Sequence, residues 1–224
     1  MLQKNTQITL QIENLGADAE GVGRADGLAV FVQGALPGET VRVRVIKTAQ
    51  RYAVGKLEEI CAPSQDRVQP PCPVYARCGG CAAQHMRYEA TLCFKRQQAI
   101  DCLTRIGHID APVVHPVWGM ETPWQYRNKG SFPVGGTTEE PQIGFYAPRS
   151  HTIIDAPQGC LLQRPQSDAL VQACREWMTR YQIAPYAEST HTGLIRHIVT
   201  RVSQDGRAMV ALVIHADALP HAQE

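Results

Sequence analysis

Thr40-Val-Arg-Val-Arg-Val45 alternates apolar and basic residues with the two-residue period of a β-strand. The three valines fall on one face, and Arg42 and Arg44 fall on the other. Alternation of this kind predicts a strand with one face in a core and one face in solvent. Such a strand needs hydrogen-bonded neighbours, so the flanking sequence decides which sheet it joins.

Similar patterns surround this strand. Residues 6–12 alternate, residues 28–32 form a short apolar run, and residues 51–60 predict another strand. Pro37-Gly38 marks a turn between two of them. Four or five short strands in about sixty residues predict a small closed β-barrel of the OB or SH3-like type. We place this barrel at residues 1–61, because a proline-rich stretch begins at residue 62.

Residues 62–224 predict a second domain that mixes helices and strands. Apolar spacing predicts a helix over residues 89–106 and another that begins at Pro165. Residues 142–146 and 151–155 predict paired strands, and Asp205-Gly206 predicts the turn of a hairpin between two later strands. The expected fold class is therefore α+β. We expect the three tryptophans to pack in the core: Trp118, Trp124 and Trp177.

Three cysteines lie within ten residues, in Cys72-Pro-Val-Tyr-Ala-Arg-Cys78-Gly-Gly-Cys81, and Cys160 is a distant fourth. Soft thiolates hold iron–sulfur clusters and zinc ions, and glycines let the backbone wrap closely around such a group. Three interpretations remain open: an iron–sulfur cluster, a zinc site with His85 as a candidate ligand, or cysteines that bind nothing. We expect the remaining cysteines to act as packing residues: Cys61, Cys93, Cys102 and Cys174.

Composition narrows the class of protein. The chain has 224 residues, of which 44% are hydrophobic, and its net charge is +1. It has no apolar stretch long enough for a membrane span and no secretory signal, so we expect a cytoplasmic protein. A disulfide-rich secreted protein is a poor fit, because such scaffolds are mostly short. Residues 61–130 carry eight basic and five acidic groups, so a nucleic-acid surface would be local.

Several motifs occur together in a definite order. Gly21-Val-Gly-Arg and the 40–45 strand are followed by the cysteine loop with Gln84-His85. Tyr126-Arg-Asn-Lys, Ile143-Gly-Phe-Tyr and Gly193-Leu-Ile-Arg-His then follow. In this order the chain resembles the RNA (uracil-5-)-methyltransferase family, and most of all its members that act on 23S ribosomal RNA. The first motifs look like that family's TRAM domain, and the later ones look like its central domain.

The resemblance implies a [4Fe-4S] cluster held by Cys72, Cys78, Cys81 and Cys160. It also implies ribosomal RNA as the partner and methyl transfer from S-adenosylmethionine to uracil C5, which forms 5-methyluridine. In that family the S-adenosylmethionine site and the catalytic cysteine lie in a C-terminal domain that this chain lacks. We therefore interpret the chain as an N-terminal fragment with no catalytic residue, inactive alone and without an obligate protein partner.

Basic residues on the expected strands and loops are candidate RNA contacts. Arg127 and Lys129 share one strand face, and the other candidates are Arg149, Arg196, His197, Arg201, Arg42 and Arg44. For each of them a solvated polar face is the simpler alternative. Two other functions also remain open: a zinc-stabilised RNA-binding adaptor, and a ferredoxin-like electron-transfer protein that uses the same cysteines.

Overall fold

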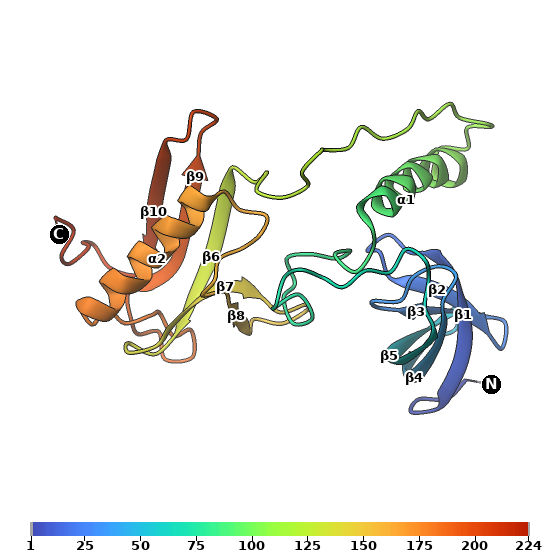
Figure 1. Ribbon diagram of the computed structural model, residues 1–224. Helices are drawn as coiled ribbons and strands as arrows, with labels where there is room; N and C mark the ends of the chain where they lie inside the picture. The colour runs from blue at the N-terminus through green and yellow to red at the C-terminus, as the bar shows by residue number, and fades with distance from the viewer. Residues whose placement is uncertain (1, 224) are drawn as a thin grey trace. The chain divides into compact units, whose positions relative to one another are not determined.

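The computed structural model describes residues 2–223, which form two compact units (Figure 1). The first unit contains the chain up to Pro71 together with Ala82–Met120. The second contains Cys72–Cys81 and the chain from Glu121 onward. The expected boundary near residue 62 coincides with the end of a strand, yet residues 63–71 and 82–120 cluster with the barrel.

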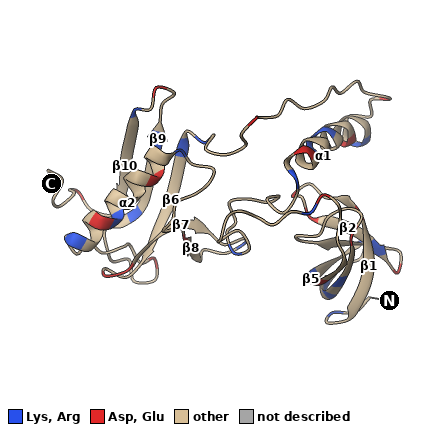
Figure 2. Ribbon diagram, in the orientation of Figure 1, with Lys and Arg blue, Asp and Glu red and all other residues tan. Residues whose placement is uncertain are grey.

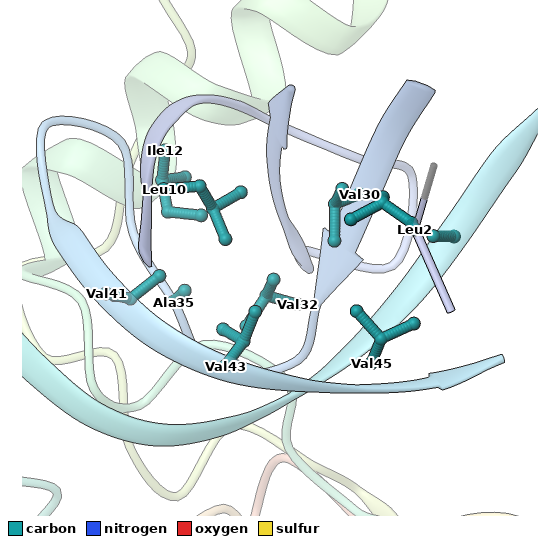
Figure 3. Close-up of a cluster of buried hydrophobic side chains, with 10 residues drawn as sticks. Leu2, Leu10, Ile12, Val30, Val32, Ala35, Val41, Val43 and Val45 are labelled. Atoms are coloured by element: carbon teal, nitrogen blue, oxygen red, sulfur yellow. The ribbon is translucent and has the colours of Figure 1, made fainter. Parts of the chain in front are cut away.

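The first unit contains a closed five-stranded barrel, as the alternating pattern predicts. Its strands, in the spatial order β1-β2-β3-β5-β4, are β1 (Gln7–Leu15), β2 (Gly21–Ala25), β3 (Leu28–Val32), β5 (Tyr52–Ala62) and β4 (Thr40–Thr48). Only β3 and β5 pair in parallel. The valines of the 40–45 segment are fully buried and point into the barrel interior (Figure 3). The core of the barrel is therefore the inner face that the sequence indicates.

A buried ion pair joins the barrel to the segment that follows β5. The Glu39 side chain has no exposed surface, and Arg67 donates to its two carboxylate oxygens at 2.5 and 2.8 Å. The Leu36 N–H also donates to this carboxylate, at 2.8 Å. Burial alone would raise the pKa of Glu39, but these hydrogen bonds outweigh it and hold the pKa below its ordinary value. A residue beyond the last strand thus neutralises a carboxylate that is buried just before β4.

Helix α1 (Tyr88–Asp101), which a π-helical turn at Cys102–Ile106 extends, confirms the predicted helix. All of its residues are described, and none of them is buried. Gln98 contacts the barrel by donating to the Ala17 carbonyl at 2.9 Å. The expectation that Trp118 packs in the core is wrong, since its side chain is 99% exposed. For α1, the periodic spacing correctly predicts a helix with an apolar stripe, but that stripe is buried only where another surface packs against it.

The second unit is an antiparallel sheet in the order β10-β9-β6-β7-β8. Its strands are β6 (Lys129–Gly136), β7 (Pro141–Tyr146), β8 (Ile153–Asp155), β9 (Ile195–Val202) and β10 (Ala208–Ile214). Helix α2 (Pro165–Arg180) lies along one face (Figure 1) and buries Val171, Cys174 and Met178 against it. The predicted hairpin is confirmed as β9 and β10. Across residues 2–223, no helix combines the length and apolar character that crossing a bilayer requires.

Replacing Glu39 by Gln (E39Q) is expected to lower the free energy of unfolding by about 3–5 kcal/mol, because Arg67 would lose its carboxylate partner. Urea titration followed by circular dichroism measures this change. Because the pKa of Glu39 is depressed, the pair stabilises the fold above the ordinary glutamate pKa and is lost as pH falls through the folded pKa. The E39Q chain should therefore lose less stability in acid.

The matched control is Glu59→Gln on the outside of the same barrel. Glu59 pairs with Arg42, and both side chains are about half exposed. An exposed pair contributes at most about 1 kcal/mol. Equal losses in E39Q and E59Q would contradict the role assigned to burial of Glu39.

Candidate metal centre and nucleic-acid interface

All four predicted ligand cysteines belong to the second unit. Three of them lie in the loop of residues 72–81, which interrupts the first unit in the sequence: Cys72, Cys78 and Cys81. Cys160 follows strand β8. Each of the four is half-buried. The Gly80 N–H donates to the Cys78 sulfur at 3.3 Å. The fold therefore gathers the four residues in one compact unit and gives one of the sulfurs a backbone donor.

The cysteine loop is attached to the sheet by its own backbone. The Gly79 N–H donates to the Tyr146 carbonyl oxygen at 2.9 Å. A Cβ atom at position 79 would lie 2.7 Å from that oxygen, so a side chain cannot fit here without a shift of backbone. The guanidinium of Arg127 donates to the Gly80 carbonyl at 3.5 Å. Gly79 thus serves close approach to the end of β7, whereas a Cβ atom at Gly80 would make only ordinary contacts.

The surroundings of Cys160 favour the neutral thiol over the thiolate. Burial raises the pKa of the Cys160 thiol, and backbone hydrogen bonds from Leu162 and Gln163 to its sulfur oppose that rise. The charge of Cys81 raises it further, which requires that Cys81 lies near Cys160. A metal or cluster would relieve this repulsion between thiolates, because it supplies the positive charge that they lack.

The structure shows no site for a single metal ion among the described residues. Within residues 2–223, no three His, Cys, Asp or Glu side chains converge closely enough to hold one metal ion. A four-iron cube takes one thiolate at each iron, so its ligands stand farther apart than ligands around one ion. His85, the candidate zinc ligand, is instead a buried residue of the first unit. Burial, with help from the Arg67 charge, lowers its pKa to about 4.

The remaining cysteines divide by exposure. Cys174 lies on the buried face of helix α2, as predicted, and burial raises the pKa of its thiol to about 11. The same prediction is wrong for Cys61, Cys93 and Cys102, which are exposed. Two of these lie in α1 and its π-helical extension, where no residue is buried.

Two predicted RNA contacts are direct neighbours. Lys129, at the start of β6, pairs in register with Arg201 of β9, and both residues are exposed. Figure 2 colours the basic positions blue, including one end of strand β6. His197 lies farther along β9 on the same face, half-buried. Burial, and then the charge of Arg196, lowers the pKa of His197. Like charges directly opposite each other on a sheet are unfavourable, which indicates that this pair serves something other than stability.

Apolar side chains flank the basic pair. Met209 of β10 lies opposite Arg201, and Val213 lies opposite His197. Their side chains are 54% and 42% exposed. These four residues, with Lys129, occupy the sheet face opposite α2, because Ile198 and Thr200 between them are buried. We call this surface the open face.

The other predicted contacts lie elsewhere. Arg127 is engaged with Gly80, and the guanidinium of Arg196 lies over the Tyr186 ring at 4.8 Å. Arg149 is exposed in the β7–β8 loop. On the barrel, Arg42 and Arg44 form ion pairs with carboxylates of β5, namely Glu59 and Glu58.

Sequence reasoning missed a polar face of helix α2. The Asp168 carboxylate accepts the Cys160 N–H at 3.2 Å, and burial raises the pKa of Asp168. Gln172 and Arg175, one and two turns later, also hold the chain before Cys160. Their spacing is the only signal in the sequence, and it is also the spacing of an ordinary solvent face.

Comparison with known proteins gives the following relations. Residues 2–57 match the TRAM domain family. The whole chain is 43% identical to an uncharacterized RNA methyltransferase of Clostridium tetani, and the match covers 48% of that protein. A second protein so named, from Listeria monocytogenes, is also 43% identical, over 100% of this chain and 49% of its own length. The chain is thus homologous to RNA methyltransferases and spans about half the length of these curated relatives.

A solved structure shares the fold. The crystal structure of Pyrococcus abyssi tRNA (uracil-54, C5)-methyltransferase in complex with S-adenosyl-L-homocysteine matches with a TM-score of 0.70. The match covers 95% of this chain and 47% of that chain, at 23% sequence identity. At this identity the likeness establishes the arrangement of strands and helices and nothing about activity.

Replacing Lys129 by Gln (K129Q) is expected to raise the free energy of unfolding by about 0.2–1 kcal/mol, because it removes repulsion from Arg201. The gain should shrink at high salt, which screens exposed charges. Urea titrations of K129Q, R201Q and the double variant form a thermodynamic cycle. A double variant as stable as either single variant supports repulsion, whereas fully additive effects would rule it out.

Proposed function

We propose that this chain is the RNA-recognition and cluster-binding portion of an S-adenosylmethionine-dependent RNA (uracil-5-)-methyltransferase. The observation that carries the proposal is the presence of four half-buried cysteines in one unit, with backbone donors at two of the sulfurs. The TRAM match and the homology to RNA methyltransferases support it. Methyl transfer itself is assigned to residues outside this chain.

The cysteines would hold a [4Fe-4S] cluster through Cys72, Cys78, Cys81 and Cys160. When bound, the cluster would supply iron–thiolate bonds that tie the cysteine loop to the segment after β8. With a cysteine on every iron, no iron is left open for substrate, so the role we propose is structural. This chain's own part is to present the four sulfurs and to keep the loop against β7 through Gly79.

RNA would bind across the open face. Lys129 and Arg201 are exposed and have no ion-pair partner within residues 2–223, so both charges are available to phosphates. Met209 and Val213 offer apolar surface to bases or riboses beside those phosphates. We take 23S ribosomal RNA as the target and transfer RNA as the comparison substrate.

Anaerobic purification of the chain is expected to give a brown protein with a broad absorbance band near roughly 400 nm and about four irons and four sulfides per chain. Absorbance, iron assay and acid-labile sulfide assay on one sample measure this. The C160S variant should lose most of the iron, whereas C93S, at an exposed cysteine of α1, should retain it. A colourless wild-type chain that holds one zinc would favour the RNA-binding adaptor. A reversible low potential without RNA affinity would favour electron transfer.

Neutralising the open face is expected to weaken RNA binding. K129Q and R201Q should each reduce the slope of log affinity against log salt by about 0.7–0.9, the value for one lost phosphate contact. Fluorescence anisotropy with a 23S ribosomal RNA fragment and a transfer RNA measures the slope and the preference. The control is R207Q, because Arg207 is exposed on the same hairpin but pairs with Asp205. Slopes equal to wild type in both variants would exclude the open face.

A further inference from the structure

One face of helix α2 holds the segment that leads to Cys160. Asp168 accepts the Cys160 N–H at 3.2 Å, and Gln172 donates to the Pro157 carbonyl at 2.9 Å. Arg175 donates to the Asp155 carboxylate at 2.7 Å. The three side chains are spaced i, i+4 and i+7, so they lie on one side of the helix. We call Asp168, Gln172 and Arg175 the α2 ladder.

The ladder stands on a fixed support. Helix α2 buries Val171, Cys174 and Met178 against the sheet, on the side next to the ladder. The Ser167 hydroxyl also hydrogen-bonds the Thr200 hydroxyl of β9, and both residues are buried. A helix anchored in this way can hold the Cys160 segment at a fixed distance from the sheet.

The hydrogen bond between Asp168 and the Cys160 N–H requires a glycine at position 159. Its φ is +84°, a conformation that favours glycine. A Cβ atom at this position would lie 2.6 Å from an Asp168 carboxylate oxygen. Only a residue without a side chain lets the backbone pass beneath the carboxylate. Gly159 and Asp168 therefore work as one unit, although they lie nine positions apart in the sequence.

We propose that the α2 ladder positions Cys160 as the fourth cluster ligand, and that the Asp168 carboxylate lowers the reduction potential of the bound cluster. The first part follows from the hydrogen bond to the Cys160 N–H, which holds the backbone from which the Cys160 side chain projects. The second follows from charge, because a nearby anion disfavours the added electron of the reduced state. The inference rests on the cluster of the proposed function. Asp168 is a positioning residue, since it acts through Cys160.

Two substitutions separate the hydrogen bond from the charge. D168A removes both and is expected to speed iron release to a chelator about tenfold or more, the usual loss when a partner of a metal ligand is removed. D168N keeps an oxygen acceptor for the Cys160 N–H but no charge. It should release iron at the wild-type rate and show a midpoint potential higher than wild type. Iron release is followed by loss of visible absorbance, and the potential by anaerobic redox titration.

The control is E176Q, which removes an exposed carboxylate two turns further along α2. It should match wild type in both measurements. Hydrogen exchange at the Cys160 amide reports directly on its hydrogen bond to Asp168. Exchange should accelerate in D168A and stay slow in D168N. Wild-type release rates and potentials in both Asp168 variants, on a loaded chain, would overturn this inference and leave the cluster standing. A wild-type chain that binds no iron would overturn the cluster and the ladder's role toward it together.

Discussion

The hydrogen bond from the Gly79 N–H to the Tyr146 carbonyl decides where the cysteine loop belongs. The chain leaves the first unit at Pro71 and rejoins it at Ala82, so ten residues must be held by the second unit. Ten residues cannot form a core of their own, and this loop depends on backbone contacts and on Arg127. Without that attachment the three cysteines would have no fixed relation to Cys160, and the site would not exist as a unit.

Sequence patterns correctly predicted the features that depend on neighbouring residues, namely strand alternation and turn formation. The barrel followed from strand alternation, and the hairpin followed from Asp205-Gly206. The sequence could not predict that Trp118 is exposed or that no residue of α1 is buried. A periodic pattern of apolar residues does not reveal which surface, if any, packs against them. The α2 ladder was equally hidden, since its partners come from a segment earlier in the chain and its spacing suits any solvent face.

Basic residues on this chain fall into two electrostatic classes. Arg42 and Arg44 sit beside carboxylates of the neighbouring strand, so their charge is largely compensated within the barrel. Lys129 and Arg201 lie opposite each other on neighbouring strands instead, so their like charges repel and lower the stability of the sheet. A sequence presents both classes as the same alternation of basic and apolar residues. Cross-strand register separates them, and register depends on the whole sheet.

The Glu39–Arg67 pair determines how long a segment must be for the barrel to be moved intact into another protein. The TRAM match ends at residue 57 and the last barrel strand at Ala62, yet the guanidinium that neutralises Glu39 comes from beyond both. Arg67 in turn forms a β-bridge with Met86, on the far side of the cysteine loop. A barrel exchanged between proteins by recombination at the end of β5 would carry a buried carboxylate that must either take up a proton or find a new cation. The piece that can move intact is therefore longer than the barrel, and the insertion of the cysteine loop lies inside it.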